Sequence, residues 1–240
     1  MAVHQDLKQA LRGLRRTPGF TGVTVLTLAL GIGASTAVFS VLETLFLRPL
    51  PFAEGERLVY LHTGDPNKHF PNSRFLPLSA ACYRDVQERQ RVFADVAAYQ
   101  SKGFALTGAG DPERVQGLRV TGSFFQVLGT QAALGRALQT ADDRDGDVVV
   151  LSHGLWSRQF GSDPSILGRR VTLDGKGYLV VGVLPPTFAW HGQPQLYVAD
   201  PPTHDELQEA KRTLAFEAVA RLKTGISLDQ ARAAMENLGR

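Results

Sequence analysis

The feature that most constrains this 240-residue chain is a long apolar segment near its N-terminus. Residues 20–47 contain a single formal charge, Glu43. A helix of this length spans about 42 Å, compared with about 30 Å for the hydrocarbon core of a bilayer. Helices of soluble domains are seldom apolar on every side over such a length. The segment therefore predicts a transmembrane helix over residues 20–47.

A short basic stretch, residues 1–19, precedes this segment. Its basic side chains are Lys8, Arg12, Arg15 and Arg16, and they lie largely off an apolar stripe of Leu7, Ala10, Leu11 and Leu14. An ordinary surface helix could show the same pattern, but next to an apolar span it is typical of a helix on an anionic membrane surface. The positive-inside rule then predicts that residues 1–19 are cytoplasmic and that residues 48–240 lie in the periplasm or outside the cell.

The overall charge gives no sign of a nucleic-acid partner. The net charge of +3 equals that of residues 1–19, so the rest of the chain is neutral. A basic nucleic-acid-binding surface is therefore not expected. The single cysteine, Cys82, excludes an internal disulfide and an all-cysteine metal site.

The apolar segment can be interpreted as an uncleaved anchor or as a cleaved signal peptide. The small residues at 33–37 resemble a cleavage region, but no Ala-x-Ala site is present and the apolar run continues to residue 47. This continuation favours the anchor. The small residues Gly31, Gly33, Ser35 and Ala37 could also let a second membrane helix approach closely. The alternative is that such residues are simply common in membrane helices.

The remainder of the chain predicts an α+β fold. Residues 57–63, 78–90 and 93–100 have the pattern of strand, helix and strand, and residues 216–222 with a helix from Ser227 repeat the first half of that unit. Ser227 and Gln230 predict a capping box at the start of that helix, and Leu228, Ala231, Met235 and Leu238 are expected to point inward. Between them lie short β segments at 103–107, 113–121, 148–151, 169–174, 178–184 and 196–198, with a helix at 152–160. The prediction is one subdomain formed by residues 48–100 plus 205–240 and a β-rich inserted lobe formed by residues 101–204. The second unit is expected to lack its closing strand, which leaves one sheet position open.

Catalytic and ligand-binding motifs are not found in the sequence. It lacks a complete dinucleotide fingerprint, a Walker A loop, a His-Glu-x-x-His motif and a Gly-x-Ser-x-Gly elbow. Ser152 and His153 are an adjacent nucleophile and base, but Ser152 is better explained as a helix cap. Residues 142–147 are acidic without the spacing of a calcium loop, which predicts a solvated turn. No catalytic, cofactor-binding or metal-binding residue is predicted.

Several stretches of the chain resemble MacB-like ABC transporter permeases, especially the acidobacterial-type duplicated orphan permeases. They are DLKQALR (6–12) and TPGF (17–20), LTLALGIGA (26–34), LRPLPF (47–52), DPERV (111–115), VVLSHGLW (149–156), the residues of 161–169, VVGV (180–183) and VARLK (219–223). The resemblance implies an N-terminal membrane helix in the inner membrane, followed by a periplasmic core domain. That domain would combine porter-like strand–helix–strand units with a β-rich insertion.

The resemblance also implies a mechanism and partners. In the family, a cytoplasmic ABC ATPase drives motion that three further membrane helices pass to the periplasmic domain, for export or extraction of a substrate. No second apolar run follows residue 47, so those helices and the ATPase-coupling region are expected to be absent from this chain. A fragment, a truncated gene and one half of a split permease would all fit.

The sequence is compatible with three functions. They are a permease subunit that couples ATPase motion to efflux, a membrane-anchored binding or scaffold module without transport, and an anchored hydrolase. The missing catalytic motifs argue against the hydrolase. The expected partners are the lipid bilayer, other permease chains and a cytoplasmic ABC ATPase.

Overall fold

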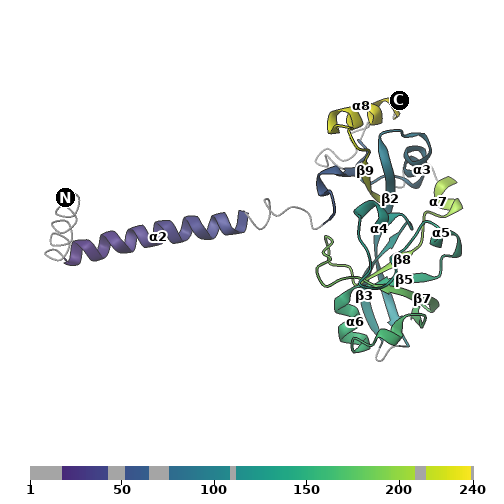
Figure 1. Ribbon diagram of the computed structural model, residues 1–240, viewed down its shortest axis with the longest axis horizontal. Coiled ribbons are helices and arrows are strands. Elements are labelled where there is room, and N and C mark those ends of the chain that lie inside the picture. Colours follow the sequence, from purple (N-terminus) through teal and green to yellow (C-terminus); the bar gives the residue numbers. More distant parts are fainter. Residues whose placement is uncertain (1–17, 43–51, 65–75, 109–111, 209–214, 239–240) are drawn as a thin grey trace. The chain divides into compact units, whose positions relative to one another are not determined.

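The computed structural model describes residues 18–42, 52–64, 76–108, 112–208 and 215–238 (Figure 1). The chain divides into two compact units, Met1–Leu50 and Pro51–Arg240. Each unit has its own fold and is described by itself.

The first unit contains helix α2, Pro18–Leu42. Its large apolar side chains Val23, Val25, Leu26, Leu28, Leu30, Ile32 and Phe39 are between 58% and 66% exposed. Four glycines, four threonines and two serines are interspersed among its 25 residues. Within the described residues, no helix combines the length and the apolar character needed to cross a membrane. The span predicted over 20–47 is thus not found there: α2 ends at Leu42, and residues 43–47 lie outside the described part.

The second unit is built on a nine-stranded mixed sheet. Its strands are β1 (Leu58–Leu61), β2 (Phe93–Thr107), β3 (Glu113–Val120), β4 (Leu134–Gly135), β5 (Val148–Leu151), β6 (Arg170–Leu173), β7 (Lys176–Val183), β8 (Leu196–Ala199) and β9 (Glu217–Leu222). The order is β1-β9-β2-β3-β8-β5-β7-β4, and β6 pairs with both β2 and β7. Among the strand pairs of the described residues, β3–β8 and β5–β7 are parallel and the others are antiparallel. The predicted α+β class is confirmed.

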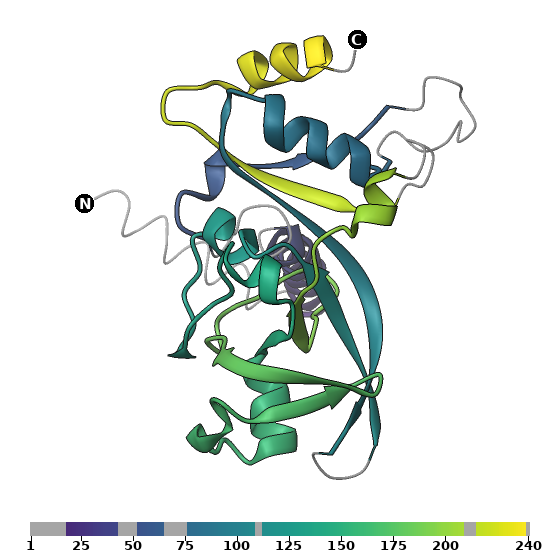
Figure 2. The ribbon, with the colours of Figure 1, turned by 90° about the vertical axis from the view of Figure 1, so that its right-hand side faces the viewer.

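One end of the sheet is open and carries two helices on one face. Strands β1, β9 and β2 pair antiparallel, and α3 (Ala80–Arg89) and α8 (Leu228–Leu238) share one hydrophobic core with them (Figure 2). The predicted capping box of α8 is confirmed, because Gln230 N–H donates to the Ser227 hydroxyl and Ser227 N–H donates to the Gln230 side chain. Leu228 was expected to point inward, but it is 54% exposed. Leu228 is the first residue of α8, whereas Ala231, further along the helix, is buried.

The other end of the sheet closes on itself. The pairs β2–β3, β3–β8, β8–β5, β5–β7, β7–β6 and β6–β2 form a ring of six strands, a small barrel. Alternate residues of these strands form its core, among them Phe104, Leu106, Val115, Val149, Leu151, Val171, Leu173, Val180, Leu196 and Val198. Gly117 is required at this packed position, because a Cβ there would lie 2.5 Å from a Leu196 methyl carbon. The predicted β-rich segment thus contains a barrel with a filled interior.

Strand β2 belongs to both ends of the sheet. It pairs with β9 along residues 93–99 and with β3 along residues 99–106. The sequence predicts two strands here, separated near Gly103, whereas the structure has a single 15-residue strand. The Arg114 side chain crosses over Gly103, at 3.1 Å from where a Cβ would lie, so the glycine gives the arginine room without interrupting the strand.

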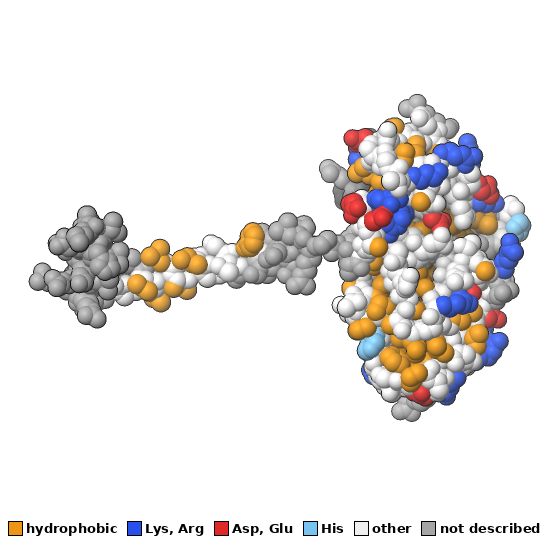
Figure 3. Space-filling model, in the orientation of Figure 1, with side chains coloured by type: hydrophobic (Ala, Val, Ile, Leu, Met, Phe, Trp, Pro, Cys, Tyr) orange, Lys and Arg blue, Asp and Glu red, His pale blue; other side chains and the backbone are white. Residues whose placement is uncertain are grey.

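Short helices fill the remaining space. They are α4 (Phe124–Leu128), α5 (Asp142–Asp145), α6 (His153–Phe160), α7 (His204–Gln208) and the 3-10 turns η2 (Gly55–Arg57) and η3 (Pro164–Ile166). Four of the five residues of α4 are fully buried in an aromatic core with Tyr99, Trp190 and Tyr197. On the face of this unit seen in Figure 3, acidic and basic side chains are interspersed.

Candidate functional site

The small residues predicted for helix packing all lie on α2. A Cβ placed on Gly31 or Gly33 would meet no heavy atom within 4 Å, and Ser35 is exposed. Ala37 follows one turn after Gly33 on the same helix. The packing role of these four residues stays a prediction. The basic residues Lys8, Arg12, Arg15 and Arg16 lie outside the described residues.

Ser152 and His153 do not form a nucleophile–base pair. The Ser152 hydroxyl accepts a hydrogen bond from Leu155 N–H at 3.2 Å, as the predicted cap of α6. His153 packs edge-on against Trp156, with its Nδ1 3.5 Å from the Ser157 hydroxyl. In the part of the chain that the structure describes, no three His, Cys, Asp or Glu residues are grouped to hold a metal ion.

The acidic segment 142–147 is not the solvated turn that its sequence suggested. Asp142 is 6% exposed and forms two hydrogen bonds with the Arg136 guanidinium, at 2.7 and 2.8 Å. Burial alone would raise the pKa of Asp142, but Arg136 and the Gln139 N–H lower it below its ordinary value. Asp143 accepts from Gly122 N–H at 2.6 Å, and burial raises its pKa. The two carboxylates therefore hold α5 against Arg136 and Gly122. The sequence of residues 142–147 alone does not predict these contacts.

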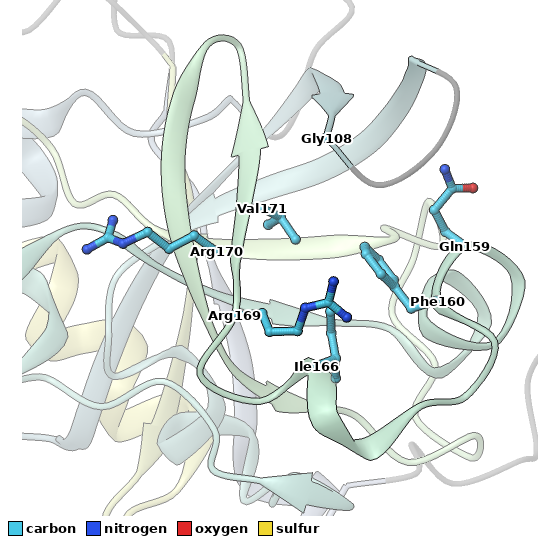
Figure 4. A pocket seen from close by; sticks show the side chains of 7 residues that line it. All are labelled: Gly108, Gln159, Phe160, Ile166, Arg169, Arg170 and Val171. Atoms are coloured by element: carbon cyan, nitrogen blue, oxygen red, sulfur yellow. The ribbon is translucent and has the colours of Figure 1, made fainter.

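A pocket of about 370 Å³ opens where the barrel closes. Strands β2 and β6 make only two pairs, Leu106 with Leu173 and Thr107 with Thr172. Beyond these pairs the pocket is lined by Gly108, Gln159, Phe160, Ile166, Arg169, Arg170 and Val171 (Figure 4). Its wall is thus assembled from the end of β2, the end of α6, the turn η3 and the start of β6.

The surface of the pocket is more polar than apolar, and residues of the barrel core lie behind it. Ile166 and Val171 belong to the barrel core, and Phe160 packs against that core. The two arginines differ in direction: the Arg169 side chain extends toward Phe160, whereas Arg170 extends away from the other labelled side chains (Figure 4). Arg170 donates to the Gly177 carbonyl at 3.1 Å. This arrangement can bind a ligand but offers no nucleophile or general base.

Asp163 lies in the sequence between Phe160 and Ile166, which both line the pocket. It accepts hydrogen bonds from the hydroxyl and the N–H of Ser165. These two bonds, and to a smaller degree the charge of Arg169, lower the pKa of Asp163. Asp163 also caps η3 and so fixes the turn that brings Ile166 into the wall.

A second polar cluster lies on the sheet face opposite α3 and α8. The buried Tyr99 hydroxyl donates to the Glu217 carboxylate at 2.7 Å and lies 3.0 Å from His191 Nε2. Burial and the neighbouring Glu217 raise the pKa of Tyr99, which keeps its proton. The cluster ties the β7–β8 connection to strands β2 and β9. No local motif in the sequence pointed to it, because its members are 92 and 118 residues apart.

Residues 21–238 match the family model described as MacB-like periplasmic core domain. The chain belongs to this family. It is a family of non-catalytic permease domains, and the predicted resemblance is confirmed. No curated protein matches the sequence.

Solved structures show the same fold at low sequence identity. The periplasmic region of MacB from Actinobacillus actinomycetemcomitans is 17% identical, with a TM-score of 0.58 over 76% of this chain and 82% of that one. A domain of a putative permease protein from Porphyromonas gingivalis is 17% identical, with a TM-score of 0.60 over 78% and 81%. The extracellular domain of the noncanonic ABC-type transporter YknZ from Gram-positive bacteria is 17% identical, with a TM-score of 0.51 over 76% and 95%.

Proposed function

We propose that this MacB-like periplasmic core domain works on the outer side of a membrane, where it couples the motion of a cytoplasmic ABC ATPase to export or extraction of a substrate. The observation that carries the proposal is the family match over residues 21–238. It is supported by a fold shared with periplasmic and extracellular domains of transporters. The function is conformational, which fits the non-catalytic character of the family.

The proposed membrane attachment rests on the N-terminal sequence and the exposed side chains of α2. Seven large apolar side chains on that helix are more than half exposed, and a lipid environment would remove them from water. Residues 20–47 would span the inner membrane, with Lys8, Arg12, Arg15 and Arg16 at its cytoplasmic surface. The small residues form two pairs one turn apart, Gly31 with Ser35 and Gly33 with Ala37, and either pair would let another permease helix approach closely.

The proposed working parts of the outer domain are a porter-like part, residues 48–100 plus 205–240, and an inserted lobe, residues 101–204. Support comes from the hydrophobic core that α3 and α8 share with β1, β9 and β2, which joins residues of 78–98 with residues of 216–231. The six-stranded ring provides the lobe with a core of its own. Strand β2 crosses the boundary, so the two parts would move as a coupled pair.

Reporter fusions test the topology on which the proposal depends. Alkaline phosphatase is active only outside the cytoplasm, and green fluorescent protein fluoresces best inside it. We expect phosphatase activity from a fusion after Arg240 and fluorescence from a fusion at Arg16. Fluorescence without phosphatase activity at Arg240 would overturn the extracytoplasmic placement.

The alternative is an anchored binding or scaffold module without transport, and the pocket favours it. Spin labels at two exposed sites, Glu88→Cys and Arg144→Cys in a Cys82→Ser background, separate the two functions. In membranes from the native cell, a coupled permease should change its label-to-label distance distribution when ATP and vanadate trap the ATPase. A scaffold should show the same distribution with and without the trap.

A further inference from the structure

Where the barrel closes, part of β6 has no neighbouring strand. The pairing of β2 with β6 stops at Thr107 and Thr172. Strand β2 ends there, and the next residue, Gly108, has a φ of 79°, which turns the chain out of the strand direction. Strand β6, in contrast, extends two residues further, to Arg170. Arg170 therefore lies at a strand edge, and this edge lines the pocket.

The main chain of Arg170 faces the open side of β6. Strands β6 and β7 are antiparallel, and Arg170 lies opposite Leu179. In such a ladder, residue pairs that exchange two hydrogen bonds alternate with pairs that exchange none. The Leu179 N–H donates to the Asp147 carbonyl at 2.8 Å, on the side of β5, so its pair with Arg170 is of the second kind. The Arg170 N–H and C=O thus point away from β7, to a side on which the described residues give them no backbone partner.

The charge beside this edge is positive. Two arginines and no acidic residue are among the described residues that line the pocket, and the exposed Arg169 side chain extends toward Phe160 (Figure 4). The carboxylate of Asp163, whose charge interacts with Arg169, already accepts two hydrogen bonds from Ser165. A main-chain donor next to a main-chain acceptor suits another peptide backbone better than a small anion, because the Arg170 C=O would repel an anion.

We infer that a short, extended, acidic segment of another polypeptide adds to the edge of β6 at this pocket. One residue of that segment exchanges two backbone hydrogen bonds with Arg170, in the place of a continued β2. The next residue lies opposite Arg169, and its carboxylate pairs with the guanidinium. In such strand addition the main chain supplies affinity and the side chains supply specificity. The inference goes beyond the proposed function and holds whether or not the chain takes part in transport.

An NMR titration of the full chain in detergent micelles, with 15N in arginine and threonine, tests the inference. The probe is the peptide Ac-Ser-Thr-Thr-Glu-Ser-NH2. We expect it to shift the Arg170 amide signal, assigned by its loss in Arg170→Lys, and to slow exchange of that amide with solvent. The same peptide with a methyl group on the third backbone nitrogen keeps its charge but cannot donate to the Arg170 C=O, so it should cause neither change. Equal effects of both peptides, or shifts of arginine signals throughout the chain, would overturn the inference.

Two matched variants test the role of the charge, with the Thr172 amide as the reporter of binding. Arg169→Gln should raise the Kd of the acidic peptide about fourfold, the scale of one exposed ion pair. Arg144→Gln removes the same charge from an exposed position of α5 outside the pocket and should leave the Kd within about 1.5-fold. Equal losses in both variants, or equal affinity for a peptide with lysine in place of glutamate, would overturn the acidic assignment. Circular dichroism of both variants confirms that each is folded.

Discussion

The guanidinium of Arg119 on β3 forms two hydrogen bonds with the carboxylate of Glu206 on α7, at 2.7 and 3.1 Å, across 87 residues of sequence. Arg119 is 9% exposed. It also bonds to Asp200 and Gln100, and its guanidinium lies 5.1 Å from the centre of the Phe216 ring. Arg119 therefore stabilises the segment between β8 and β9, which leads from the barrel back to the open sheet.

We expect Arg119→Ala to lower the free energy of unfolding by about 3 kcal/mol, because it removes the buried guanidinium with all its bonds and leaves the carboxylates of Glu206 and Asp200 without that partner. Urea denaturation of residues 51–240 measures the change. Arg232→Ala is the matched control, since Arg232 forms an exposed pair with Asp229 on α8. That variant should change stability by less than about 0.5 kcal/mol. A similar effect in both variants would show that the Arg119 cluster is not a fastening point.

Acid should weaken the same contact. The bonds from Arg119 hold the pKa of Glu206 below its ordinary value of 4.5. A carboxyl whose folded pKa is lowered stabilises the protein above its unfolded pKa and loses that contribution as the pH falls through the folded pKa. At pH 7, Glu206→Gln should therefore be about 1 kcal/mol less stable than the wild type, and the difference should shrink steadily below pH 4.5.

The pH experiment needs a difference measurement, because burial raises the pKa of Asp95 and Asp143 and those groups act in the opposite direction. The contribution of Asp95 and Asp143 cancels in the difference between the unfolding free energies of Glu206→Gln and the wild type, measured at each pH. Glu236→Gln, a change at an exposed position of α8, serves as the control. A stability difference for Glu206→Gln that stays constant from pH 7 to pH 3 would contradict the argument.

A glycine in β7 should tolerate no side chain. The Arg136 carbonyl oxygen occupies the place that a Cβ on Gly182 would need. Gly182→Ala must therefore displace backbone, and we expect a loss of about 3 kcal/mol by thermal or urea unfolding. Gly154 on α6 has open space around it, so Gly154→Ala should raise stability by about 0.5–1 kcal/mol through helix propensity. Stabilisation by both substitutions would refute the packing explanation.

The edge of β1 should promote self-association. Within the described residues, β1 pairs on one side only, with β9, and an unpaired edge offers free backbone groups to another strand. We expect residues 51–240 to associate with rising concentration in sedimentation experiments. Tyr60→Lys places a charge at this edge and should shift the protein toward monomer.

Leu228→Lys distinguishes this edge from simple hydrophobic association. Leu228 is also an exposed apolar residue, but it lies on α8. The Leu228→Lys substitution should therefore leave the association constant nearly unchanged. If Leu228→Lys dissociates the protein and Tyr60→Lys does not, the contact uses the helix surface and not the strand.

Local signals predicted local structure well. The buried strand at 148–151, the Ser152 cap and the Ser227–Gln230 box follow from a few adjacent residues. The closure of the barrel does not, because it depends on pairing Leu106 with Leu173, far apart in the chain. The same holds for the pocket, whose lining comes from the ends of β2 and α6, the turn η3 and the start of β6. The prediction of a solvated turn at residues 142–147 was wrong for Asp142. An acidic run is usually solvated, but the fold places the Arg136 guanidinium against this carboxylate.

The continuity of β2 has a mechanical consequence. At about 3.4 Å per residue, its 15 residues extend roughly 50 Å without a break. A hinge needs a flexible linker, and none separates the open sheet from the barrel along this strand. A force applied at the α3–α8 end would reach the barrel as twist and bending of one backbone, held on both sides at Tyr99 by Glu217 and Val120. The two ends of the domain would then move relative to each other only as far as the sheet twists and bends, so its response would be set by sheet elasticity.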